Sequence, residues 1–234
     1  MSIADNVAQI QKRITAAAGR VARNPQEVAL MAVTKTVAPE PIREAYAAGL
    51  RLFGENRVQE FAAKTQALRD LRDPEWHMIG HLQGNKAAKA VELFSGIDSV
   101  DSVRLAQKLN AAAQVSGRKL SVLLEINIGG EQAKSGLDPD SPELEQLLSA
   151  APELDHLRMS GLMTVPPFSE NPEETRPYFR RLRELRDRVK ERNLSAVSLH
   201  TLSMGMSHDF EVAIEEGSTC VRIGTAIFGE RRRA

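Results

Sequence analysis

Side chains that can bind a ligand or react gather in five short segments, each at or just after a predicted β-strand. These segments are Lys35 with its neighbours (VTKT), Glu55 with Asn56 (in GENRVQE), His77–Lys86 (HMIGHLQGNK), Ser203–Asp209 (SMGMSHD) and Arg222–Gly229 (RIGTAIFG). In a barrel of parallel strands, binding and catalytic residues stand at the carboxyl ends of the strands. We therefore expect the five segments to meet around one site.

Lys35 is the most unusual of these residues because it comes at the end of an apolar run, Val28–Val33. Burial lowers the pKa of a lysine amine from its usual value of about 10.4, and the neutral amine is a nucleophile. Alternatively, the stem of Lys35 packs in the protein while its ammonium group reaches water. The position of Lys35 alone leaves both interpretations open.

Ser207, Gly224 and Thr225 indicate a phosphate site near the seventh and eighth strands. We expect Ser207 to cap the helix that follows it, and Gly224 with Thr225 to begin a last helical turn. Free N–H groups at two helix N-termini would then converge on one anion, in the region where barrels often bind phosphate. Taken singly, each Gly–Ser or Gly–Thr pair is more typical of ordinary turns and caps.

The elements that must position these segments alternate between short apolar strands and helices. An amphipathic N-terminal helix precedes them, with apolar residues from Ile3 to Val21 spaced by three, four or seven. The predicted strands are Val28–Val33, Leu52–Phe53, Trp76–Ile79, Ile97–Val100, Leu120–Ile128, Leu157–Leu162, Val197–Leu202 and Thr219–Ile223. The predicted helices are Pro39–Ala48, Arg57–Leu71, Lys86–Phe94, Ser102–Val115, Pro142–Ala150, Glu173–Arg192 and Phe210–Glu216, with a last turn near Thr225.

Eight such units in 234 residues predict an α/β fold. We expect one domain, residues 1–234, folded as a TIM (β/α)8 barrel with an extra N-terminal helix. A doubly wound sheet would also alternate, but no GxGxxG motif follows the first strand, which argues against a Rossmann fold.

Two other motif matches are incomplete. The loop Gly129–Ser135 (GGEQAKS) resembles a P-loop, but Ala133 stands where a P-loop has its second glycine. His77 and His81 are spaced as in zinc proteases, but Met78 replaces the glutamate of that motif. We therefore expect neither a nucleotide-binding P-loop nor a metal.

Composition narrows the classes of partner. Lys and Arg total 31, as do Asp and Glu, so the formal net charge is zero and does not attract nucleic acid or an anionic membrane. The chain shows neither an apolar signal core nor an apolar run near the roughly 18 residues of a membrane span. Cys220, the single cysteine, lies in an apolar stretch typical of a buried structural thiol. We expect a cytoplasmic protein.

Taken together, the motifs resemble the YggS/PROSC family of pyridoxal 5′-phosphate (PLP) homeostasis proteins. The motifs stand in family order as VTKT, GENRVQE, HMIGHLQGNK, AKSG (Ala133–Gly136), GLM (Gly161–Met163), SMGMSHD and RIGTAIFG. Each motif alone is weak, but the ordered set is highly specific and spans almost the whole chain. One departure is TVAPEP after Lys35, where the family often has TKP.

The resemblance implies a barrel like the N-terminal domain of alanine racemase, without that enzyme's second β domain. It also implies PLP as a Schiff base on Lys35, with Arg222 near the pyridine nitrogen. The phosphate contacts that it implies come from Ser203, Ser207, Gly224 and Thr225. Asn56 and His81 match motif positions that line the pocket. The cofactor-binding residues that the resemblance implies are Lys35, Asn56, His81, Ser203, Ser207, Arg222, Gly224 and Thr225.

The resemblance further implies a carrier or buffer of PLP that acts in vitamin B6 and amino-acid homeostasis, with little or no turnover and no catalytic residues. PLP-dependent apo-enzymes are candidate recipients, and we expect a monomer. The alternative is a PLP-dependent amino-acid racemase. Racemases of this fold need a tyrosine as a second base, supplied by another domain and a partner subunit. The two tyrosines of this chain, Tyr46 and Tyr178, fall within predicted outer helices and are poor candidates for that base. A third hypothesis is a barrel enzyme that forms a substrate Schiff base on Lys35 with a phosphorylated metabolite.

Overall fold

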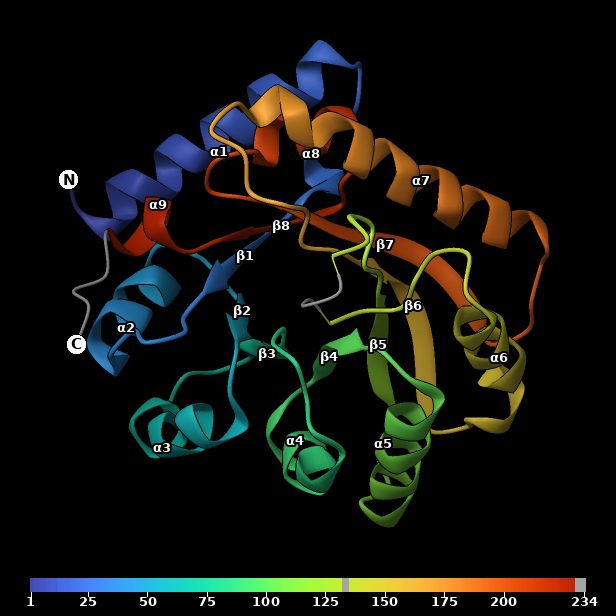
Figure 1. Ribbon diagram of the computed structural model, residues 1–234. Coiled ribbons are helices and arrows are strands. Elements are labelled where there is room, and N and C mark those ends of the chain that lie inside the picture. The colour runs from blue at the N-terminus through green and yellow to red at the C-terminus, as the bar shows by residue number, and fades with distance from the viewer. Residues whose placement is uncertain (132–134, 230–234) are drawn as a thin grey trace.

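Eight parallel strands close into a barrel in the computed structural model, which describes residues 1–131 and 135–229 (Figure 1). The strands are β1 (Ala29–Val33), β2 (Leu52–Glu55), β3 (Glu75–Met78), β4 (Gly96–Val100), β5 (Leu120–Glu125), β6 (Leu157–Met163), β7 (Val197–Met206) and β8 (Cys220–Ile223). They neighbour one another in sequence order, and β8 pairs with β1 to complete the ring. The predicted (β/α)8 barrel is confirmed.

Helices form the outer layer around these strands (Figure 1). The α-helices are α1 (Ile3–Arg20), α2 (Pro39–Ala47), α3 (Val58–Leu68), α4 (Ala87–Leu93), α5 (Val103–Val115), α6 (Pro142–Ala150), α7 (Arg176–Glu191), α8 (Phe210–Glu215) and α9 (Thr225–Phe228). The short 3-10 helices are η1 (Pro25–Glu27), η2 (Gly84–Lys86), η3 (Ala151–Glu153) and η4 (Pro172–Thr175). None of these described helices is long and apolar enough to cross a membrane.

The extra N-terminal helix α1 packs against α2, α8 and α9 (Figure 1). Ser2 and Asp5 form a capping box at its start, because the Ser2 hydroxyl accepts from the Asp5 N–H while the Asp5 carboxylate accepts from the Ser2 N–H. Its apolar stripe, including Ile10 and Ile14, is buried. Helix α1 therefore covers the side of the barrel where the last β–α units lie.

Three strands end two or more residues away from their predicted ends. Strand β2 continues to Glu55 and β7 to Met206, so Glu55 and Ser203 lie within strands and not after them. Near the site the strands carry polar side chains, so each apolar run stops before its backbone ladder does. Strand β5 ends at Glu125, although the predicted strand continues to Ile128. Ile126 and Ile128 are buried beyond the end of the strand, so their apolar character did not mark where the strand stops.

The barrel interior beneath the site is filled by side chains. A Cβ atom on Gly54 would lie 2.8 Å from the Met31 Sδ and 3.0 Å from the Ile79 Cδ1. The missing side chain of Gly54 thus leaves room for these two larger residues. Met31 shares one face of β1 with Val33 and lies one layer deeper in the barrel, where it is buried.

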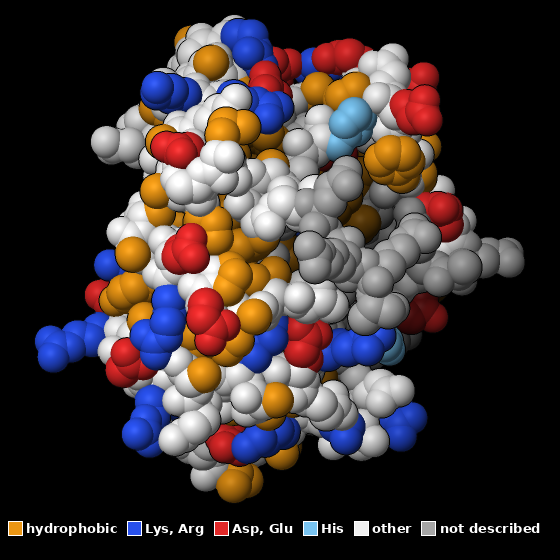
Figure 2. Space-filling model, turned by 90° about the vertical axis from the view of Figure 1, so that its left-hand side faces the viewer, with side chains coloured by type: hydrophobic (Ala, Val, Ile, Leu, Met, Phe, Trp, Pro, Cys, Tyr) orange, Lys and Arg blue, Asp and Glu red, His pale blue; other side chains and the backbone are white. Residues whose placement is uncertain are grey.

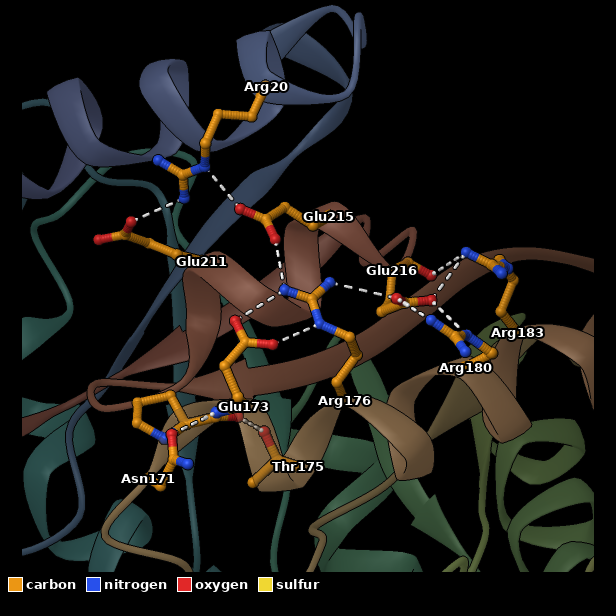
Figure 3. A network of polar contacts seen from close by, with 11 residues as sticks. Arg20, Asn171, Glu173, Thr175, Arg176, Arg180, Arg183, Glu211, Glu215 and Glu216 are labelled. Carbon is orange, nitrogen blue, oxygen red and sulfur yellow. Dashed lines mark hydrogen bonds and ion pairs between the residues drawn. The ribbon is translucent and has the colours of Figure 1, made fainter.

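A network of arginines and glutamates joins α1, α7 and α8 outside the barrel (Figure 3). Arg176 pairs with Glu215 at 2.6 Å and with Glu216 at 3.2 Å, and Arg20 on α1 also pairs with Glu215. Arg180 adds a further pair to Glu216 at 3.1 Å. Networks of this kind contribute more than isolated surface pairs, so the end of α8 is firmly held.

Charges of both signs are interspersed over the face shown in Figure 2, with apolar side chains between them, some in adjoining groups. Among the described residues, this face therefore carries no broad region of one charge that would steer a strongly charged partner. The pattern agrees with the formal net charge of zero.

Candidate functional site

A cavity of about 420 Å³ lies at the carboxyl ends of the strands. Its lining consists of Val33, Lys35, Asn56, Ile79, Val165, Phe168, Met206, Ser207, His208, Arg222, Gly224 and Thr225. Six of the eight binding residues expected from the sequence are in this lining, and the other two, His81 and Ser203, are not. The cavity is therefore the candidate site.

Lys35 enters the cavity from the turn that follows β1. The side chains of Val33 and Ile79 belong to the same lining, so the lysine stem stands among apolar neighbours. The residue as a whole is half-buried. Between the two interpretations left open by the sequence, this position favours an amine that meets a ligand over one that reaches the outer surface.

Ser207, Gly224 and Thr225 come together where α9 begins. Gly224 is the N-cap of this helix, and the Ser207 hydroxyl accepts a hydrogen bond of 3.4 Å from the Ala226 N–H in its first turn. The predicted role of Ser207 as the cap of α8 is therefore wrong, because its hydroxyl points to α9.

An aspartate stands at the start of α8. Asp209 is the N-cap residue of α8 and only 5% exposed, and its Oδ1 accepts a hydrogen bond of 2.7 Å from the Met206 N–H. Burial raises the pKa of Asp209, against the hydrogen bond from Met206 and the positive charge of Arg222. The Asp209 side chain turns back to the Met206 N–H and caps no N–H of α8. The predicted convergence of two helix N-termini on one anion therefore stays a prediction.

Arg222 stands inside the barrel on β8 and is only 3% exposed. Its guanidinium donates to the Ser203 carbonyl at 2.6 Å, to the Ser203 hydroxyl at 2.8 Å and to the Thr164 carbonyl at 2.7 Å. These bonds fix the plane of the guanidinium at the cavity wall. Ser203 is fully buried behind Arg222, so it supports that side chain here, and its phosphate contact stays a prediction.

Buried carboxyl groups balance the charge of Arg222. Burial lowers the pKa of Arg222, and the carboxylates of Asp98, Asp209 and Glu125 oppose that effect. Burial and the nearby Asp101 raise the pKa of Glu125 to about 7, although Arg222 and His81 act in the opposite direction. Glu125 Oε2 is buried and makes no hydrogen bond to the described residues. A carboxyl group that titrates near neutrality thus lies close to Arg222.

Asn56 and His81 have different places around the cavity. Asn56 lines it directly, but the side chain of His81 is 54% exposed and its Nδ1 lies 3.1 Å from the Asp101 carboxylate. His81 shares a neighbouring groove with Asn56 and Arg57. The pocket-lining role expected of His81 is therefore not seen in this cavity, and its part in binding stays a prediction.

Sequence reasoning did not single out the apolar rim of the cavity. Val165 and Phe168 follow β6 and are 40% and 80% exposed, and the Phe168 ring lies 5.9 Å from the His208 ring. The signal available in the sequence was a pair of apolar residues, Val165 and Phe168, on either side of two prolines in the loop after β6. The P-loop-like segment includes residues 132–134 and the AKSG motif includes residues 133 and 134, which all lie outside the described residues.

Sequence comparison identifies the relatives of this chain. The family model of the alanine racemase N-terminal domain matches residues 3–232. The pyridoxal phosphate homeostasis protein of Aquifex aeolicus is 48% identical over 233 residues, which cover 99% of this chain and 100% of that protein. The chain belongs to the family of pyridoxal phosphate homeostasis proteins. The order of its motifs, from VTKT to RIGTAIFG, agrees with that membership.

Structural comparison extends the result for this member of the family. PipY of Synechococcus elongatus, solved with PLP bound, is 38% identical, with a TM-score of 0.84 and coverage of 97% of this chain and 100% of PipY. An alanine racemase of Clostridium difficile has a TM-score of 0.75 but only 16% identity, and the match covers 98% of this chain and 58% of the racemase. The likeness to the racemase shows a shared barrel fold alone.

Proposed function

We propose that this chain binds PLP as a Schiff base on Lys35 and holds it as a carrier or buffer in vitamin B6 and amino-acid homeostasis. The observation that carries the proposal is the convergence of Lys35, Arg222 and the start of α9 on one cavity. The names of its relatives and the PLP in PipY support the same reading.

The cavity fits each part of PLP. The cofactor supplies an aldehyde, which a primary amine such as that of Lys35 attacks to form an imine with loss of water. Ser207, Gly224 and Thr225 offer a hydroxyl group and the N-terminus of α9 to the phosphate. Val33 and Ile79 offer apolar contact to the ring.

Arg222 is the residue that we assign to the pyridine nitrogen. An arginine is always protonated and only donates hydrogen bonds, so beside the ring it disfavours a protonated pyridine through repulsion of like charges. Many PLP enzymes that stabilise carbanions strengthen the ring as an electron acceptor with an acidic partner instead. Racemases tolerate an arginine there because they add a well-placed second base, and we find no good candidate for that base among the tyrosines. We therefore propose little or no catalytic turnover.

The positions of the two tyrosines disfavour the racemase alternative. Tyr46 lies on α2, where its hydroxyl donates to the Arg72 carbonyl at 2.7 Å, and Tyr178 lies on α7. Neither belongs to the cavity lining. The cytoplasmic location, the monomeric state and apo-enzymes as recipients of PLP stay predictions.

The deciding experiment is the absorption spectrum of the purified protein. Wild type should show the visible band of a Schiff base, and borohydride should fix PLP on the peptide that contains Lys35. Lys35→Ala should lose both signals, whereas the control Lys12→Ala, at an exposed position of α1, should keep them. Covalent PLP in Lys35→Ala would contradict the assignment.

A second assay tests the carrier reading. Loaded protein should show no racemase, transaminase or decarboxylase turnover with a panel of amino acids. Turnover that depends on Lys35 and survives further purification would favour an enzyme.

A further inference from the structure

Lys35 belongs to a β-turn, residues Thr34–Val37, which we name the Lys35 turn. The Val37 N–H donates to the Thr34 carbonyl at 3.0 Å and closes the turn. Thr36 is its third residue and has a φ angle of 58°. Turns with positive φ at this place usually use glycine there, because a β-branched side chain disfavours that conformation. The conformation beside Lys35 must therefore be held by contacts from outside the turn.

Two side chains of α3 supply these contacts. Lys64 Nζ donates to the Thr34 carbonyl at 2.8 Å, to Glu55 Oε1 at 2.9 Å and to Glu60 Oε1 at 2.7 Å. Glu60 Oε1 also accepts a hydrogen bond of 2.5 Å from the Thr36 N–H. Lys64 and Glu60 thus make hydrogen bonds to the backbone of the turn on both sides of Lys35.

These hydrogen bonds involve the two peptide units that flank the Lys35 Cα. The Thr34 carbonyl belongs to the peptide before Lys35, and the Thr36 N–H belongs to the peptide after it. Because each peptide is planar, fixing both planes fixes φ and ψ of Lys35 and hence the direction of its Cα–Cβ bond. Lys64 and Glu60 therefore control where the amine of Lys35 is delivered.

Glu55 holds Lys64 in place. Its side chain is fully buried, Lys64 is only 11% exposed, and Glu55 Oε1 also accepts from the Thr34 hydroxyl at 2.7 Å. A salt bridge as buried as this is weak support for stability, because desolvation offsets much of the attraction. The Lys64–Glu55 salt bridge also contacts the Lys35 turn, through the Thr34 carbonyl and the Thr34 hydroxyl, and so can hold the turn in place.

We propose that Glu60 and Lys64, supported by Glu55, are positioning residues that hold the Lys35 turn in the conformation that can form the Schiff base. This inference rests on the proposed Schiff base at Lys35. Without these contacts the turn spreads over other conformations, and the apparent affinity for PLP falls by the fraction of chains that stay competent.

The first test is Glu60→Ala, because Glu60 is 24% exposed and its loss leaves the Lys64–Glu55 pair intact. If about one chain in ten stays competent, the dissociation constant for PLP rises about tenfold. The matched control, Gln66→Ala, lies at an exposed position of the same helix and should bind PLP as wild type does. The readout is the visible band during titration of ligand-free protein with PLP.

A second variant removes the other contact without leaving a buried charge unpaired. Glu55→Gln combined with Lys64→Met takes away the lysine and the carboxylate together, and it should weaken PLP binding in the same way. Thermal unfolding of the ligand-free proteins reports whether each variant is folded. A loss of affinity in folded variants supports the proposal, and unchanged affinity in both would overturn it.

Two further backgrounds separate positioning from a general disturbance of the cavity. Glycine adopts positive φ without strain, so Thr36→Gly should restore most of the affinity lost in Glu60→Ala. In Lys35→Ala, whose residual PLP binding is non-covalent, Glu60→Ala should have no further effect, because the contact acts only through Lys35.

Equal losses with and without Lys35, or no recovery with Thr36→Gly, would refute the positioning role and leave the proposed function standing. Covalent PLP in Lys35→Ala alone would instead refute the proposed function.

Discussion

Replacing Glu125 with glutamine should stabilise the ligand-free protein above neutral pH. Glu125 Oε2 is buried without a hydrogen bond to the described residues, and burial together with Asp101 raises the pKa of Glu125 from 4.5 to about 7. At a pH between these values the folded chain holds a proton that the unfolded chain has released. The free energy of unfolding therefore falls as pH rises, by about 1.4 kcal/mol for each pH unit in this range.

The magnitude follows from the same two values. The stabilising effect of the proton is fully present below the unfolded pKa of 4.5 and is lost as pH passes through about 7. Over that range the ionisation of Glu125 costs about 3 kcal/mol, at about 1.4 kcal/mol for each pKa unit. Glutamine has a similar shape and cannot ionise, so Glu125→Gln avoids this loss.

Urea unfolding of wild type and Glu125→Gln at several pH values from about 5 to about 8 measures the difference. The gap between the two unfolding free energies should widen with pH until it reaches about 3 kcal/mol. The control, Glu191→Gln at the exposed end of α7, should follow wild type throughout. Parallel curves for wild type and Glu125→Gln would show that Glu125 ionises as easily in the folded protein as in the unfolded chain.

Two further outcomes follow from the site and the core. Gly224→Val adds a side chain to the cavity lining at the start of α9, so the affinity for PLP should fall about tenfold or more. The affinity for pyridoxal, which lacks the phosphate, should change less. Equal losses for both ligands in titrations would argue against a phosphate at this end. Cys220 is buried, and burial raises the pKa of its thiol to about 12. Iodoacetamide should therefore label Cys220 only after unfolding. Rapid labelling of the native protein, detected by mass spectrometry, would contradict this prediction.

The barrel was predictable because its strands are short, apolar and buried on both faces. Such runs are the usual sign of a parallel sheet covered by helices, and the observed β1 and β8 lie within the predicted ones. The ends of β2 and β7 were not predictable from hydrophobicity. There the backbone ladder continues through Glu55 and Ser203, whose side chains are polar.

The site was predictable where a residue faces the cavity directly from a strand end, as Lys35, Asn56 and Arg222 do. Contacts that cross between elements were not predictable. Glu60 is the last residue of the GENRVQE motif, but nothing in its spacing shows that it accepts the Thr36 N–H. Ser207 likewise bonds to α9 and not to the helix next in sequence, because the barrel brings the ends of β7 and β8 together.

How strongly the PLP ring accepts electrons depends on which charged group meets the pyridine nitrogen. Two charged groups in this region, Glu125 on β5 and Arg222 on β8, influence each other's pKa values. A carboxylate there would favour a protonated ring and a strong electron acceptor, and a guanidinium favours the opposite. Arg222 lines the cavity and Glu125 does not. The guanidinium donates three hydrogen bonds, two to Ser203 and one to Thr164, and these hold it at the cavity wall. Such a site can keep PLP covalently bound while leaving the ring a weak electron acceptor, which is what a carrier requires.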